Sequence, residues 1–139
     1  MARFFLDTHV AYWLVSESPK LDDNLRDDIL YPTGNHYLIS DFVILELMHL
    51  NQLGKIKIPG GSKALFGAFK SMNIEMDLIT DKTFGTLENI PILIIGGLKH
   101  TDMMDRAIIA QCIANKGTLI SHDSKFPYYR TYGLDLLEA

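Results

Sequence analysis

The sequence has 139 residues, enough for one domain with a proper hydrophobic core. Its composition is globular, with 47% hydrophobic and 22% charged residues, and no apolar run reaches about 18 residues, the length of a membrane-spanning helix. The net charge of −4 argues against a general polyanion-binding surface. It does not exclude nucleic acid, because a bound metal ion would cancel the charge of the acids that hold it.

Apolar periodicity and turn residues divide the chain into alternating strands and helices. In chain order we expect strand 4–6, helix 8–15, helix 21–30, strand 37–39, helix 41–53, helix 63–72, strand 74–79, helix 81–89, helix 105–115, strand 118–120 and strand 134–137. The apolar stretch 91–95 is ambiguous. Strands that alternate with helices predict an α/β domain whose mostly parallel sheet is covered on both faces. No glycine-rich phosphate-binding motif follows a strand, so we expect no nucleotide cofactor.

Two of the predicted strands are followed closely by an aspartate. Asp7 comes directly after strand 4–6, and Asp123 comes three residues after strand 118–120. Open α/β sheets bind ligands at the carboxyl ends of their strands, so neighbouring strands would bring both carboxylates to one crevice. For either residue alone a helix cap or turn is an equally common role, and Thr8 is also a candidate cap. The repetition after two buried strands favours a functional site.

Further acids lie on the predicted helices. Glu46 is surrounded by apolar residues such as Val43 and Leu47, where a charge is costly unless it is paired or bound to metal. Its alternative role is that of a boundary residue between core and solvent. Asp105 opens helix 105–115 on the side that faces the core, and its alternative role is a favourable charge at a helix N-terminus. Asp102 is either the cap of this helix or an outer member of the site.

A cluster of these carboxylates predicts a bound divalent cation. Unit charges about 4 Å apart repel by roughly 4 kcal/mol per pair at an effective dielectric near 20, so an ion must offset them. All-oxygen ligands select hard ions, which favours Mg²⁺ or Mn²⁺ over zinc. The five histidines lack a zinc-like pattern, so we expect them at the surface, behind the ligands or facing substrate.

These residues resemble a known family, the PIN-domain ribonucleases, and specifically the VapC-type toxins of bacterial toxin–antitoxin pairs. The resemblance covers essentially the whole chain and depends on four motifs in this order: Leu6-Asp7-Thr8-His9; Ser40 with Glu46 and Gly54-Lys55; His100-x-Asp102-x-x-Asp105-Arg106 with Ala110-Gln111; and Leu119-Ile120-Ser121-His122-Asp123. The subgroup usually reads Asp-Pro-Phe-Asp-Arg, whereas this chain has Met103-Met104 between its two acids, and His122 stands where a small residue is common.

The resemblance implies a PIN-like three-layer α/β/α fold and a single PIN domain over residues 1–139. It implies a central, mostly parallel sheet in the order 3-2-1-4-5, in which strands one and four are neighbours. The implied catalytic and metal-binding acids are Asp7, Glu46, Asp105 and Asp123, with Asp102 as an additional acid of this subgroup. The supporting residues are Ser121, whose hydroxyl orients the site, Thr8, and Arg106, which contacts phosphate or braces an acid.

The implied activity is Mg²⁺- or Mn²⁺-dependent hydrolysis of phosphodiester bonds in RNA. The implied partners are an RNA substrate, a cognate antitoxin protein near the acids and a second copy in a homodimer, with no membrane involved. The single cysteine, Cys112, and the absence of a signal-peptide pattern suit the cytoplasm. Two alternatives are a catalytically silent PIN domain that binds RNA or protein and a DNA nuclease on the same fold. The retained acids argue against the first, and the short chain argues against the second.

Overall fold

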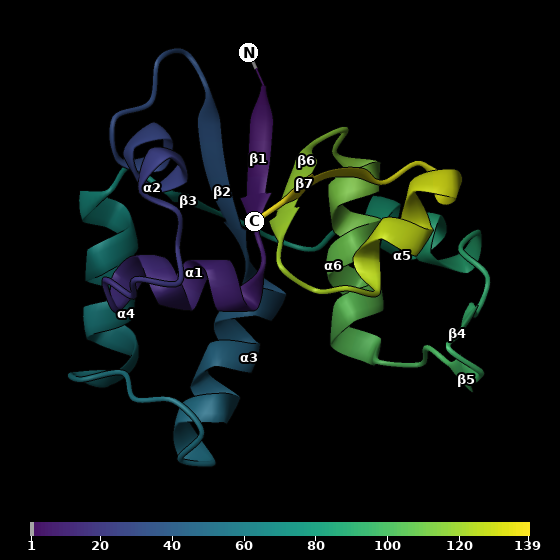
Figure 1. Ribbon diagram of the computed structural model, residues 1–139, viewed down its shortest axis with the longest axis horizontal. Coiled ribbons are helices and arrows are strands. Elements are labelled where there is room, and N and C mark those ends of the chain that lie inside the picture. The colour runs from purple at the N-terminus through teal and green to yellow at the C-terminus, as the bar shows by residue number, and fades with distance from the viewer. Residues whose placement is uncertain (1) are drawn as a thin grey trace.

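A parallel sheet of five strands forms the centre of the computed structural model, which describes residues 2–139 (Figure 1). The strands are β1 (Arg3–Leu6), β2 (His36–Ser40), β3 (Glu75–Asp77), β6 (Thr118–Ser121) and β7 (Asp135–Glu138). They lie in the order β3-β2-β1-β6-β7, and each neighbouring pair is parallel. Counted in chain order within this sheet, the order is 3-2-1-4-5, so the predicted topology is confirmed.

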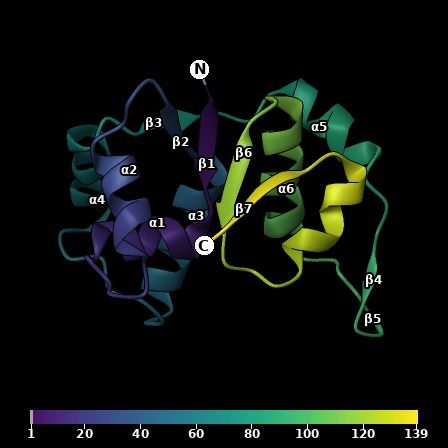
Figure 2. The same cartoon turned by 45° about the horizontal axis from the view of Figure 1, so that its top comes forward.

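Helices cover both sides of the sheet. They are α1 (Thr8–Val15), α2 (Asp23–Leu30), α3 (Asp41–Gln52), α4 (Gly61–Ser71), α5 (Asp81–Glu88), α6 (Met103–Ala114) and the 3-10 helix η1 (Phe126–Tyr132). In two views α1, α2 and α4 lie on one side of the strands, and α5 and α6 lie on the other (Figure 1 and Figure 2). This is the predicted three-layer α/β/α arrangement. Within residues 2–139, no helix is both long and apolar enough to cross a membrane.

The central strand β1 is apolar because it is buried on both faces. Phe5 and Leu6 are almost inaccessible to solvent, as are Leu119 and Ile120 of the neighbouring strand β6. A strand in this position shows a continuous apolar run and no alternation with polar residues. The ladder extends one residue past β1, because the Asp7 amide donates a hydrogen bond of 3.0 Å to the Ile120 carbonyl. The sheet therefore fixes the backbone of Asp7 against β6.

The structure adds one element that the sequence did not indicate, η1, and begins α6 two residues early, at Met103. Two further regions also differ from the predicted elements. The ambiguous stretch forms an antiparallel hairpin of β4 (Ile94–Ile95) and β5 (Leu98–Lys99), whose strands are too short to show a period in the sequence. Its two-residue turn, Gly96-Gly97, has positive φ at both positions, which glycine adopts without strain. The strand predicted over 74–79 is only three residues long, because β3 is an edge strand that pairs with β2 alone.

Gly117, which precedes β6, should not tolerate a side chain. A Cβ at this position would lie 2.6 Å from Phe5 Cε2 and 3.2 Å from the Arg3 carbonyl oxygen. Overpacking of this kind costs about 1–3 kcal/mol, so we expect Gly117→Ala to lower the free energy of unfolding by that amount in urea denaturation. Gly67→Ala in α4 is the control, since its Cβ meets nothing within 4 Å and alanine favours a helix. Equal losses in the two variants would contradict the proposed clash.

Candidate active site

Asp7 is the first residue after β1, and its buried carboxylate has two hydrogen-bond donors. The side chain is 5% exposed; Oδ1 accepts from the Thr8 amide at 2.8 Å and Oδ2 accepts from Ser121 Oγ at 2.7 Å. Asp7 is therefore the N-cap of α1, and the expectation that Thr8 caps this helix is wrong. Thr8 is instead the first residue of the helix, and its backbone amide is the group that the Asp7 side chain caps. Burial raises the pKa of Asp7, although both hydrogen bonds oppose this effect.

Ser121 links Asp7 to Asp123 across the boundary between β1 and β6. Its hydroxyl donates to Asp7 Oδ2 and accepts from the Asp123 amide at 3.0 Å. The Asp123 carboxylate accepts from the Lys125 amide at 2.8 Å, and the Lys125 ammonium lies 4.0 Å from the same oxygen. Strands β1 and β6 are neighbours as predicted. The buried Ser121 hydroxyl connects Asp7, which follows β1, to Asp123, which follows β6.

Thr8 connects Asp7 to Glu46, the acid that the sequence placed in helix 41–53. The Thr8 hydroxyl donates to Glu46 Oε1, which joins the first turn of α1 to the middle of α3. Glu46 is half-buried, as expected for a charge beside an apolar stripe. Its negative charge also contributes to the raised pKa of Asp7. Glu46 thus lies within electrostatic range of the Asp7 carboxylate.

Asp105 carries the clearest electrostatic signal of the site. Burial, together with the negative charges of other acids, raises the pKa of its carboxyl to about 8. Burial has the largest effect, and the acids follow in the order Asp102, Asp123, Asp7 and Glu46. Asp102 is exposed, and its Oδ1 accepts from the Asp105 amide at 3.0 Å. Asp102 is therefore the N-cap of α6, which explains why this helix begins at Met103 and not at Asp105.

His100 is a buried partner of Asp105 that the sequence did not distinguish from the other histidines. Its Nε2 lies 3.1 Å from Asp105 Oδ2, and its Nδ1 lies 2.6 Å from the Tyr129 hydroxyl. The His100 side chain is almost fully buried, and burial lowers its pKa. The only sequence signal was its position at the start of the motif that contains Asp102 and Asp105.

Arg106 does not brace an acid, which was one of the two roles that the sequence suggested. Its Nη2 donates a hydrogen bond of 2.6 Å to the carbonyl of Ile90, just after α5. Within residues 2–139, no ion pair joins Arg106 to an acid. The residue therefore fastens the start of α6 to the end of α5.

The donor chemistry of the site fits a hard divalent cation. All four acids offer carboxylate oxygens, and Mg²⁺ typically binds one or two carboxylates while it keeps several waters. In the described part of the chain, no three acidic, histidine or cysteine side chains are placed so that they could hold a metal ion together. The raised pKa of Asp105 reflects first its burial and then the negative charges of the other acids, which a cation would offset. By their chemistry, the carboxylates fit Mg²⁺ or Mn²⁺.

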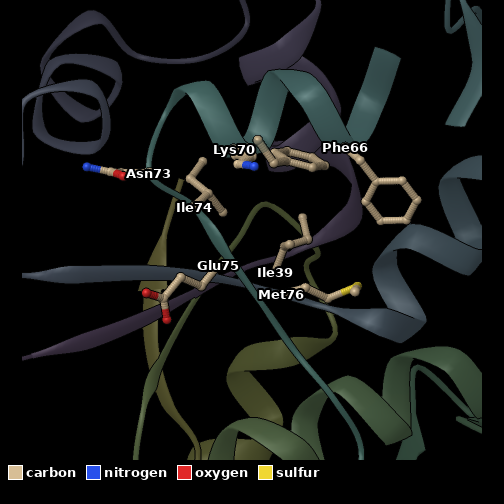
Figure 3. A pocket seen from close by; sticks show the side chains of 8 residues that line it. Ile39, Phe66, Lys70, Asn73, Ile74, Glu75 and Met76 are labelled. Carbon is tan, nitrogen blue, oxygen red and sulfur yellow. The ribbon is translucent and has the colours of Figure 1, made fainter. Parts of the chain in front are cut away.

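An apolar groove of about 390 Å³ lies elsewhere, beside the edge strand β3 (Figure 3). One wall comes from α4, with Phe66, and the other comes from β2 and β3, with Ile39 and Met76. Phe69 of α4 also lines the groove. Phe69 is buried, whereas Phe66 is 44% exposed. None of the four acids lines this groove, so it is separate from the candidate active site.

Comparison with known proteins identifies the fold. The sequence matches no family model and no curated protein. In the structure of VapBC2 from Rickettsia felis bound to a DNA fragment from their promoter, one chain is 22% identical, with a TM-score of 0.72 and 98% of both chains covered. A chain of DNA-bound VapBC from Salmonella typhimurium is 15% identical, with a TM-score of 0.65, covering 99% of this chain and 98% of that one.

A third similar structure is that of VapC20 from Mycobacterium tuberculosis, described as a sarcin–ricin loop cleaving toxin. It is 16% identical, with a TM-score of 0.56, and covers 98% of this chain and 99% of its own. At these identities the likeness establishes the fold. The PIN-like fold expected from the sequence motifs is therefore confirmed over nearly the whole chain.

Proposed function

We propose that the chain is a PIN-domain endoribonuclease of the VapC type, which hydrolyses phosphodiester bonds in RNA with Mg²⁺ or Mn²⁺ and is the toxin of a toxin–antitoxin pair. The observation that carries this proposal is Asp105, whose pKa is raised to about 8 by burial and by the charges of four other acids. A strongly perturbed carboxyl among carboxylates at the carboxyl end of a parallel sheet is typical of a catalytic metal site. The shared fold with VapC structures supports the reaction class.

Each acid has a role in this proposal. The ion would be held by Asp7, Asp105 and Asp123. Glu46 would bind the ion or orient the attacking water, and the hydroxyls of Thr8 and Ser121 hold the carboxylates they contact in place. The bound ion would lower the pKa of water and neutralise charge on the phosphate. Asp102, as the cap of α6, would act on the site through its charge.

The proposed partners follow from the same assignment. They are a structured RNA, a cognate antitoxin protein and a second copy of the chain, all in the cytoplasm. The antitoxin is supported by the fold shared with chains of VapBC complexes. Gel filtration with light scattering would measure whether the isolated chain is a dimer.

A cleavage assay separates the proposal from its alternatives. Purified protein, stripped of metal with EDTA, would be incubated with structured RNA and with single- and double-stranded DNA, with and without Mg²⁺. We expect cleavage of RNA only, and only with Mg²⁺. Binding of RNA without cleavage would favour the silent module, and cleavage of DNA in preference to RNA would favour the DNA nuclease. Cleavage that persists in EDTA would contradict the metal-dependent mechanism.

A further inference from the structure

We propose that His100 and Tyr129 are positioning residues, which together orient the Asp105 carboxylate toward the metal site. This inference rests on the proposed function, since it assigns Asp105 to the metal. Its basis is a continuous line of hydrogen bonds from the Tyr129 hydroxyl through the His100 ring to Asp105 Oδ2, with heavy-atom distances of 2.6 Å and 3.1 Å.

The direction of these hydrogen bonds follows from the chemistry of the groups. When a bound cation keeps Asp105 ionised, its carboxylate only accepts hydrogen bonds, so Nε2 of a neutral His100 carries the ring proton and donates it. Nδ1 is then an acceptor, and the Tyr129 hydroxyl is the group that donates to it. Tyr129 therefore selects the tautomer of His100 that can hold Asp105. Histidines and carboxylates around metal sites are commonly oriented by partners of this kind.

The burial of these residues indicates that their geometry is fixed. Tyr129 is inaccessible to solvent, and His100 is 6% exposed. The two rings are also in edge contact, with centroids 5.5 Å apart at an interplanar angle of 63°. Each comes from a different segment: His100 follows β5, and Tyr129 belongs to η1. The contact therefore fastens η1 to the loop that leads into α6.

The hydrogen bond occupies only one oxygen of Asp105. Oδ2 faces His100, and within residues 2–139 no hydrogen bond involves Oδ1. A carboxylate held by one oxygen has its other oxygen in a defined direction, available to a cation. Without His100 the side chain could rotate about its χ angles, and the ion would bind a less ordered ligand.

The test is Tyr129→Phe, which removes one hydroxyl and retains the buried ring. Partners behind metal ligands typically contribute 10–100-fold to metal affinity, so we expect Tyr129→Phe to weaken Mg²⁺ binding about 10-fold in calorimetry. Cleavage at subsaturating Mg²⁺ should fall by a similar factor. Tyr128→Phe is the matched control, because this neighbouring tyrosine is 57% exposed. Thermal unfolding of both variants would verify that they fold.

A double-mutant cycle distinguishes positioning from simple packing. If Tyr129 acts through His100, then Tyr129→Phe should weaken Mg²⁺ binding in the wild-type background and have no further effect in His100→Ala.

The tautomer of His100 gives a second test. In saturating Mg²⁺, the imidazole ¹⁵N shifts of His100 should report the Nε2–H tautomer, and Tyr129→Phe should populate the other one. Unchanged Mg²⁺ affinity in Tyr129→Phe, equal effects in both backgrounds or an Nδ1–H tautomer in the wild type would each overturn the inference. Wild-type protein that binds no Mg²⁺ would instead refute the proposed function.

Discussion

Asp7→Asn should abolish Mg²⁺-dependent RNA cleavage and leave the protein folded. The amide cannot provide the negative charge of a metal ligand. Because loss of residues that merely support ligands costs 10–100-fold, we expect activity to fall by at least about 100-fold. The fold should survive, since asparagine Oδ1 can still accept from the Thr8 amide, and the Ser121 hydroxyl can turn to accept from Nδ2. The measurement is cleavage rate together with thermal unfolding.

The stability of this variant is part of the prediction. Burial raises the pKa of Asp7, which means that the folded protein disfavours the charged carboxylate. A neutral asparagine removes this unfavourable charge, so the metal-free variant should unfold at the same temperature as the wild type or higher. Asp27→Asn on the exposed face of α2 is the control and should change neither property. Full activity in Asp7→Asn would refute its role, and an unfolded variant would show that its role is structural.

Without metal, the protein should lose stability as the pH rises from about 4 to about 8. The pKa of Asp105 is about 8 in the folded protein and near the ordinary value of 3.8 in the unfolded chain. Between these values the folded state binds more protons, so each rise in pH favours unfolding. One pKa unit corresponds to about 1.4 kcal/mol, so the contribution amounts to several kcal/mol at most. Thermal unfolding over this pH range measures it.

Two further experiments test whether Asp105 causes this pH dependence. Asp105→Asn should flatten the pH dependence, because it removes the group that titrates, and Asp27→Asn should leave the dependence unchanged. Mg²⁺ binds the ionised acids, so it should stabilise the wild type more above pH 8 than at pH 6. An identical pH profile in wild type and Asp105→Asn would contradict the raised pKa. Equal stabilisation by Mg²⁺ at both pH values would contradict Asp105 as a ligand.

The resemblance to the PIN-domain family implied the sheet order, whereas the residues themselves indicated that β1 and β6 are short apolar strands, each with an aspartate close behind. Their pairing placed Asp7 near Asp123, as expected. What the sequence left open was whether each acid is a cap or a site residue. For Asp7 the structure shows the cap, and the proposed function assigns the same residue to the metal. Asp7 caps α1 and also contacts Ser121. A cap and a metal ligand require the same residue type, so periodicity alone could not separate them.

The partners of Asp105 were beyond sequence reasoning. Tyr129 lies 29 residues after His100, in a 3-10 helix too short and irregular to give a periodic signal. The charge of Arg106 suits a phosphate or an acid. In the structure its side chain points to the Ile90 carbonyl, because α5 packs against α6. Contacts of this kind depend on how the elements are oriented, which composition and spacing do not determine.

The order in which the chain is synthesised has a consequence for the site. The site residues are spread along the sequence, since Asp7 follows β1, whereas the Asp123 carboxylate and the Tyr129 hydroxyl follow β6. A nascent chain on the ribosome that has not yet reached β6 lacks Ser121 and Asp123, and β1 has no neighbour on that side. The proposed ribonuclease therefore has no complete centre until β6 and the residues that follow it have been synthesised.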